Sequence, residues 1–94
     1  MKHYIIAKFR EGYDWKSELD RIRGIFLATE KYEGVESVEV RTSCSDRQNR
    51  AHLMILIHVT PEGLRNYDVS EEHRTWKRDY GPHLESKAIF DCGE

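Results

Sequence analysis

The sequence predicts a single α+β domain in which helices cover one face of a four-stranded antiparallel sheet. Four segments rich in β-branched and aromatic residues alternate with two helical stretches in the order β-α-β-β-α-β, which is the ferredoxin-like order. The chain has 94 residues, the length of one domain, and contains no repeat, low-complexity tract or linker. We therefore expect residues 1–94 to fold as one unit.

The first strand and the first helix are expected in the opening third of the chain. Residues 3–9 are rich in strand-forming residues and end before the turn signal Glu11-Gly12. Asp14 then stands where a helix N-cap is needed, and Gly34 marks the end of the helical pattern. Between them a stripe recurs at steps of four, three, four and three residues, which predicts an amphipathic helix. Its members are Trp15, Leu19, Ile22, Phe26 and Thr29.

The two middle strands are expected over residues 35–42 and 51–59, joined by a polar loop over residues 44–50. Residues 35–42 alternate between apolar and polar side chains, which is typical of a half-exposed strand. Residues 51–59 form the strongest strand pattern of the chain, because apolar residues occupy both alternating sets of positions.

The second helical region is expected to consist of two helices. Thr60 is a good cap and Pro61 suits the first helical position, so a short helix should run to about Tyr67. A second helix is expected over residues 71–80, because Ser70 is a good N-cap and two acidic residues follow it.

The second of these helices is expected to end at Gly81-Pro82, and a final short strand is expected over residues 87–92, which are rich in strand-forming residues. In the helix before the stop, the side chains of His73, Trp76 and Tyr80 are spaced to lie on one face.

The strand over residues 51–59 also predicts a homodimer. It is apolar on both faces, whereas the helices of this fold cover only one. In the first strand, Tyr4 and Ile6 likewise alternate with Ile5 and Ala7. We therefore expect the uncovered sheet faces of two copies to pack together; the alternative is a monomer with a partly exposed apolar sheet. The expected interface residues are Tyr4, Ile6, Leu53, Ile55 and Ile57.

Composition excludes several classes of function. The net charge of -2, with both signs well mixed, provides no basic surface for nucleic acid. The longest apolar run, Leu53 to Ile57, is far too short to span a membrane, and the N-terminus shows no signal peptide. Cys44 and Cys92 lack the spacing of a metal knuckle, and the sequence leaves a single disulfide between them open without supporting it. The expected location is therefore the cytoplasm.

Neither a metal nor a cofactor is expected. His3, His52 and His58 invite a zinc hypothesis, since imidazole is a common zinc ligand. Antiparallel pairing of their strands would place His3 near His58 and away from His52, so the three would not share a site. A set of His3, His58 and His73 stays open as the alternative. No carboxylate or cysteine spacing completes a ligand set, and no cofactor motif is present.

Tyr67 and His73 are the candidate catalytic residues, because together they could carry out proton transfer. Histidine titrates near neutral pH, and a tyrosine hydroxyl can polarise a carbonyl. Six residues along one continuous helix would turn the two side chains to different faces, by about 600° in total. A new helix starting at Ser70 breaks this geometry and allows both side chains to meet at one opening. The structural alternative is a partly buried histidine bonded to backbone and a tyrosine that closes the core.

The ordered set of segments along the chain resembles the stress-responsive A/B barrel domain, a family of dimeric α+β barrels. The resemblance covers nearly the whole chain and rests on five segments. These are Lys2–Phe9, Glu33-Gly34-Val35, Ala51-His52-Leu53, Tyr67 with His73, and Ile89-Phe90-Asp91.

The resemblance implies a dimeric barrel and a site. A plant polyketide cyclase of this family carries a tyrosine and a histidine at the same separation. By that likeness Tyr67 would polarise a substrate carbonyl and His73 would act as the base. The implied substrate pocket comprises His3, Ile5, Ala7, His52, Met54, Leu56, Trp76, Leu84 and Ile89.

One segment departs from the family. Members often carry His-Pro-x-His there, whereas this chain reads Ser70-Glu71-Glu72-His73. The acidic pair predicts a site that disfavours an anionic substrate. Two functions are consistent with the sequence. One is a domain that binds a small apolar or carbonyl-containing molecule, as a polyketide-cyclase-like proton-transfer enzyme or a cofactor-free monooxygenase. The other is a non-catalytic dimeric stress-response protein.

Overall fold

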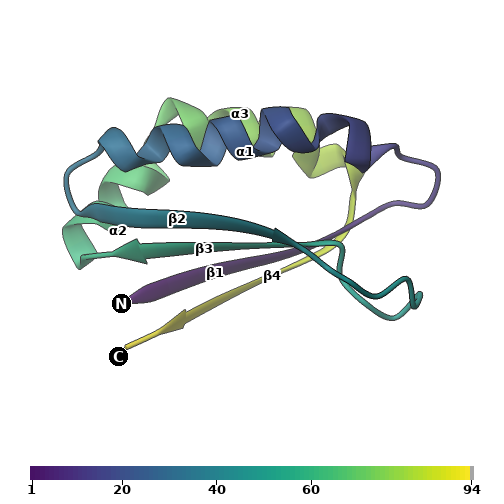
Figure 1. Cartoon of the computed structure of the whole chain (residues 1–94). Helices are drawn as coiled ribbons and strands as arrows, with labels where there is room; N and C mark the ends of the chain where they lie inside the picture. The colour runs from purple at the N-terminus through teal and green to yellow at the C-terminus, as the bar shows by residue number, and fades with distance from the viewer. Residues whose placement is uncertain (94) are drawn as a thin grey trace.

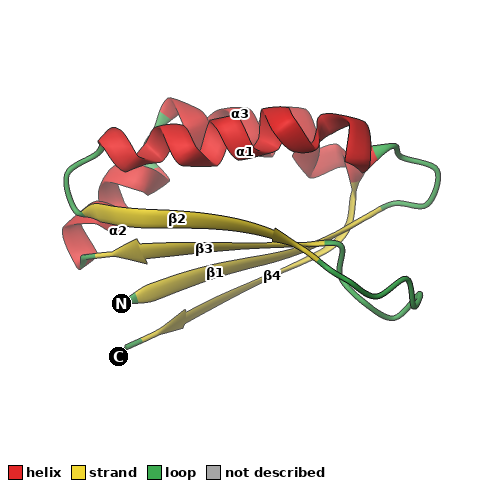
Figure 2. Ribbon diagram, in the orientation of Figure 1, coloured by secondary structure: helices red, strands yellow, loops and turns green. Residues whose placement is uncertain are grey.

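The computed structural model describes residues 1–93 and confirms the predicted ferredoxin-like order of elements (Figure 1). One antiparallel sheet has the strand order β2-β3-β1-β4. Its strands are β1 (Lys2–Phe9), β2 (Val35–Thr42), β3 (Leu53–Val59) and β4 (Leu84–Cys92). Helices α1 (Leu19–Leu27) and α3 (Glu71–Tyr80) lie over one face, and α2 (Pro61–Asp68) lies at the end of β3 (Figure 2).

The predicted caps are present, and they explain where the helices start. The side chain of Thr60 accepts a hydrogen bond from the Gly63 N–H at 3.0 Å, and that of Ser70 accepts one from the His73 N–H at 3.1 Å. Asp14 caps a 3₁₀ turn, Trp15–Glu18, that precedes α1, so the first helical region is not one continuous α-helix. Two further 3₁₀ turns, Ala28–Lys31 and Gly81–His83, follow α1 and α3.

The register between β1 and β3 corrects the predicted assignment of sheet faces. Ala7 lies opposite Leu53, Ile5 opposite Ile55 and His3 opposite Ile57. Directly opposite residues of an antiparallel pair point to the same face. Leu53, Ile55 and Ile57, expected at the dimer interface, are therefore buried beneath the helices. Met54 and Leu56, expected in the pocket, lie instead on the outer face with Tyr4 and Ile6.

The physical reason for this error is the composition of β3. A strand with apolar side chains on both faces contains no alternation that would mark the buried one, and a slip of one residue exchanges the two faces. Only the pairing with β1 resolves the choice. Fully buried side chains of the helices, including Ile22, Phe26 and Trp76, complete the core above the sheet.

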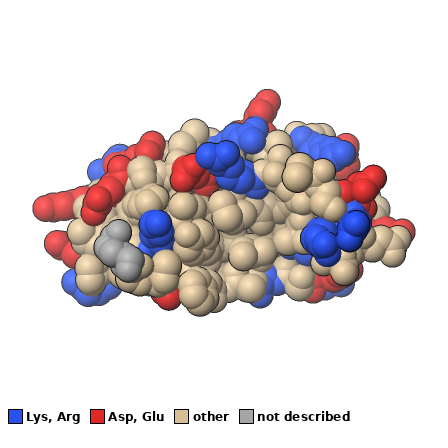
Figure 3. Space-filling model, turned by 60° about the horizontal axis from the view of Figure 1, so that its bottom comes forward, with Lys and Arg blue, Asp and Glu red and all other residues tan. Residues whose placement is uncertain are grey.

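The outer face of the sheet is apolar across its middle. Phe90 is 60% exposed and Ile6 38% exposed, and the ring of Tyr4 lies 6.2 Å from that of Phe90. Figure 3, turned so that the sheet comes forward, shows an uncharged central surface with most charged side chains around it. The structure therefore presents an uncovered apolar face, as the sequence predicted, although with different residues of β3.

None of the helices in the described part of the chain combines the length and the apolar character that a membrane crossing requires.

A contact between two glycines joins α2 to the start of β2. Gly34 has φ +86°, a conformation that other residues rarely adopt, and its carbonyl accepts the Thr60 N–H at 2.9 Å. A Cβ atom placed on Gly63 would lie 2.1 Å from the Gly34 oxygen. The two backbones therefore touch with no room for a side chain.

Replacing Gly63 with alanine should destabilise the protein, because the backbone of Gly34 cannot yield to a methyl group. We expect the free energy of unfolding in urea to fall by about 2 kcal/mol or more. The control is G24A, at a position within α1 where a Cβ meets nothing within 4 Å. That substitution should stabilise the protein by about 0.5–1 kcal/mol. Equal effects of the two substitutions would contradict the close contact.

Candidate functional site

The break between α2 and α3 brings Tyr67 and His73 together. Their ring centroids lie 4.8 Å apart, although one residue belongs to the last turn of α2 and the other to the first turn of α3. Ser70 sets this geometry. Its hydroxyl donates to the Tyr67 carbonyl at 2.7 Å while accepting the His73 N–H, so one side chain links the end of one helix to the start of the next.

The hydroxyl of Tyr67 is buried and forms no hydrogen bond with a described residue. Its side chain is 1% exposed, and the hydroxyl has no hydrogen-bond partner among residues 1–93. A buried polar group without a partner is costly and uncommon in folded proteins. Burial also raises the pKa of the Tyr67 hydroxyl well above its ordinary value near 10. Tyr67 is therefore suited to donate a hydrogen bond and unsuited to act as a base.

His73 has one ring nitrogen committed and one available. Its Nδ1 lies 2.9 Å from the backbone carbonyl oxygen of Asp68. A carbonyl oxygen only accepts, so Nδ1 carries the hydrogen of this bond. In the neutral ring Nε2 then holds the lone pair and can accept a proton.

These two residues line a hollow of about 270 Å³ between α3, the end of α2 and the sheet. We call it the Tyr67 hollow. Four of the predicted pocket residues also line it: His3, Ile5, Trp76 and Ile89. Three further lining residues were missed by sequence reasoning: Asp68, Lys77 and Lys87. Lys77 lies one helical turn after His73, so the i, i+4 spacing could have indicated that both side chains lie on the same face of α3. The position of Lys87 follows only from the pairing of β4 with β1.

His3 forms the floor of the Tyr67 hollow together with Ile5. Its ring is 5.8 Å from that of Tyr67, and the residue is 7% exposed. The Nδ1 of His3 is hydrogen-bonded to a carboxylate oxygen of Asp91, its cross-strand neighbour on β4. An ionised carboxylate only accepts, so Nδ1 donates and the ring orientation is fixed.

The other predicted pocket residues do not line the Tyr67 hollow. Met54 and Leu56 lie on the outer face, as described above. Ala7 is fully buried in the core, and Leu84 packs against the core at the far end of β4, opposite Phe9.

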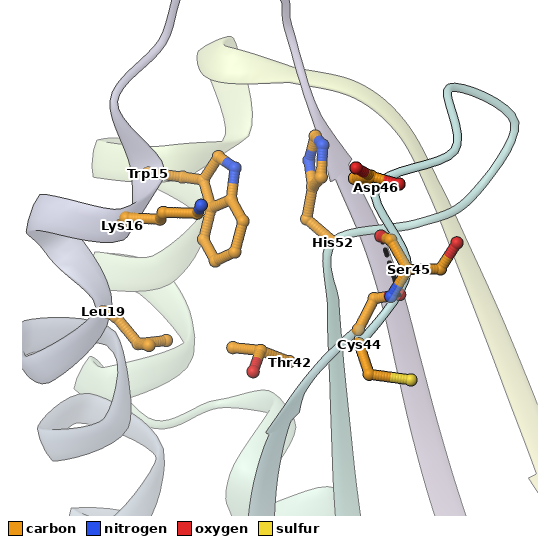
Figure 4. Close-up of a pocket in the computed structure, with 9 residues that line it drawn as sticks. Trp15, Lys16, Leu19, Thr42, Cys44, Ser45, Asp46 and His52 are labelled. Carbon is orange, nitrogen blue, oxygen red and sulfur yellow. Dashed lines mark hydrogen bonds between the residues drawn. The ribbon is translucent and has the colours of Figure 1, made fainter.

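His52 lies in a second hollow of about 660 Å³, which we call the Trp15 hollow (Figure 4). Trp15 and Leu19 line one side, and Thr42–Asp46 line the other. The Phe9 N–H donates to His52 Nδ1 at 3.0 Å, and the ring of Trp15 stacks on His52 at 5.0 Å. Burial, with a smaller contribution from Lys8, lowers the pKa of His52.

The Trp15 hollow is larger, but the smaller one is the better candidate for chemistry. His52 already uses Nδ1 to satisfy a backbone amide, and its depressed pKa makes it a weak base. The only buried side-chain polar atom without a partner among residues 1–93 is the hydroxyl of Tyr67, a residue that lines the other hollow. Within the same residues, no group of three or more histidine, cysteine, aspartate or glutamate side chains is arranged to hold a metal ion.

Comparison with known proteins identifies the class of fold. No protein-family model matches the chain, and no curated protein sequence matches it. Solved structures do match it over nearly its whole length. A dimeric ferredoxin-like protein of unknown function from Jannaschia sp. CCS1 superposes with a TM-score of 0.81 at 14% identity, covering 99% of this chain and 97% of that one.

Two further structures extend the comparison. A DABB family protein with a ferredoxin-like fold from Mesorhizobium loti has a TM-score of 0.72 at 16% identity, covering 99% of this chain and 94% of its own. The hydroxynitrile lyase from Passiflora edulis has a TM-score of 0.73 at 12% identity, covering 95% and 87%. These likenesses show that this chain has the ferredoxin-like fold.

Replacing Tyr67 with phenylalanine should stabilise the ligand-free protein, because it removes a buried hydroxyl that has no partner. We expect the free energy of unfolding in urea to rise by about 1 kcal/mol. The matched control is Y80F at an equally buried tyrosine, whose hydroxyl accepts from Arg21 at 3.0 Å and donates to Glu18 at 2.9 Å. Y80F should lower the same quantity by about 1.5 kcal/mol. A comparable loss in Y67F would show that its hydroxyl contributes to folding.

Proposed function

We propose that the protein binds a small carbonyl compound in the Tyr67 hollow and transfers a proton at the carbon next to the carbonyl. The observation that supports this most directly is the buried, unpartnered hydroxyl of Tyr67 beside His73. A carbonyl oxygen is the ligand atom that such a donor lacks. Ile5, Trp76 and Ile89 supply the apolar walls that would surround the carbon skeleton.

The proposed step uses each side chain in one role. Tyr67 donates a hydrogen bond to the substrate carbonyl oxygen. His73 Nε2 accepts the proton from the adjacent carbon, and the electron pair of the broken C–H bond forms the C=C bond of an enolate. Tyr67 stabilises the negative charge on the enolate oxygen through this hydrogen bond. A preorganised donor stabilises developing charge most strongly in a site that excludes water. The enolate then takes the proton back from His73, or attacks a second carbonyl of the same molecule in an aldol cyclisation, in which the oxygen of that second carbonyl receives the electron pair of its C=O bond and takes the proton from His73.

We also propose that the protein is a homodimer formed through the outer faces of two sheets. The interface would comprise Tyr4, Ile6, Met54, Leu56 and Phe90, which replaces the set expected from the sequence. Two observations support it: the exposure of large apolar side chains on this face, and the dimeric nature of proteins with the same fold.

The proton-transfer proposal is tested by deuterium exchange. Methyl 4-oxopentanoate, a small neutral ketone, is incubated with the protein in D₂O, and exchange next to the ketone is followed by NMR. Because H73Q removes the base, we expect it to slow the catalysed exchange by about 10²–10⁴-fold. The control H83Q alters an exposed histidine that stacks on Tyr13, away from the Tyr67 hollow, and should exchange like the unaltered protein. Equal rates for H73Q and the unaltered protein would overturn the role of His73 and favour the non-catalytic alternative.

The dimer is tested by placing a charge on the proposed interface. I6E should convert the protein to a monomer at micromolar concentration in sedimentation velocity, because two carboxylates would be buried against apolar side chains. The control L27E changes an apolar residue on the helical side that is 46% exposed, a similar exposure to Ile6. L27E should sediment as a dimer. A monomer before any substitution would contradict the proposal.

A further inference from the structure

We infer that the carbonyl compound bound in the Tyr67 hollow carries a carboxylate, which lies at a rim formed by Lys77 and Lys87. This inference rests on the proposed function and adds the charge of the substrate to it. It is opposite to the expectation from the acidic pair Glu71-Glu72, and it follows from where the structure places each charged group.

The two lysines reach the hollow from different elements. Lys77 comes from α3, one turn after His73, and Lys87 comes from β4, opposite Ala7 of β1. Neither ammonium group has an ion pair or a side-chain hydrogen bond with a described residue. By contrast, Lys8 pairs with Glu85 and Lys31 with Glu72. Within residues 1–93, the two positive charges at the rim of the Tyr67 hollow thus have no ion-pair partner.

The acidic pair before His73, Glu71 and Glu72, lies away from the Tyr67 hollow. The carboxylate of Glu72 accepts hydrogen bonds from the Tyr32 hydroxyl at 2.6 Å and from Lys31 Nζ at 2.9 Å. Glu71 and Glu72 both line a groove between α1 and α3, together with Thr75, on a different face of α3 from His73 and Lys77. The acidic pair therefore does not line the Tyr67 hollow.

Two other acidic residues, Asp91 and Asp68, lie near the Tyr67 hollow. Asp91 is hydrogen-bonded to His3 and does not line the hollow. Asp68, an exposed residue, also lines it, and the backbone carbonyl of Asp68 accepts from His73. The lining thus contains two lysines that form no ion pair with a described residue and one aspartate, a balance that attracts an anion.

The size of the hollow limits the substrate. Its volume of about 270 Å³ is just below the range of about 300–1,000 Å³ that is typical of small-molecule pockets. A carbonyl at the Tyr67 hydroxyl and a carboxylate at the lysine rim must therefore belong to one short molecule. The chemical class is a small oxo acid.

A matched pair of ligands tests the charge. The probes are 4-oxopentanoate and its methyl ester, which share the ketone and differ in the carboxylate. The chain has two tryptophans, and each hollow is lined by one of them: Trp76 in the Tyr67 hollow and Trp15 in the other. Their indole N–H signals in NMR therefore report separately on the two hollows. We expect 4-oxopentanoate to shift the Trp76 signal with about tenfold higher affinity than the ester at low ionic strength, and the difference to shrink with added salt.

Three lysine variants separate the possible outcomes. K77Q and K87Q should each lower the affinity for 4-oxopentanoate by about threefold and leave that for the ester unchanged. K16Q, which changes a lysine at the Trp15 hollow, should affect neither. Equal binding of acid and ester at Trp76 would overturn the carboxylate inference and leave the proposed function standing. If neither probe shifted Trp76, both would be overturned.

Discussion

The pairing of β1 with β3 is the constraint on which the other features depend. Because Ile5 lies opposite Ile55, one alternating set of side chains from both strands lies beneath the helices and the other set faces outward. The inner set provides His3 and Ile5 to the floor of the Tyr67 hollow. The outer set provides Tyr4 and Ile6 to the uncovered face. A shift of one residue would exchange the floor of the site with the outer surface.

Ser70 has a comparable role on the helical side. Ser70 is the N-cap of α3, and the two hydrogen bonds of its hydroxyl link the end of α2 to the start of α3. Without this break, Tyr67 and His73 would project in different directions from one helix. Two kinds of local structure therefore position the residues of the site. Strand alternation places His3 and Ile5 on the sheet side of the hollow, and helix capping places Tyr67 and His73 on the helical side.

The sequence predicted those features that local chemistry determines. The caps at Thr60 and Ser70, the strand Val35–Thr42 and the meeting of Tyr67 with His73 all follow from neighbouring residues. The assignment of Met54 and Leu56 was wrong, because a strand that is apolar on both faces leaves its orientation to its partner. The positions of Lys87 and of the Glu72 carboxylate were also out of reach, since each depends on contacts between segments distant in sequence.

The sheet ends at β4, which pairs with β1 on one side only. Within residues 1–93, no strand pairs with the outer edge of β4, and such an edge can recruit a strand from another chain and begin aggregation. Charged side chains along β4, at Glu85, Lys87 and Asp91, oppose such pairing. Lys87 is thus one of the charged side chains that oppose edge pairing, and it also lies at the rim of the Tyr67 hollow, where we propose that the carboxylate binds. Selection on either property would preserve the same side chain.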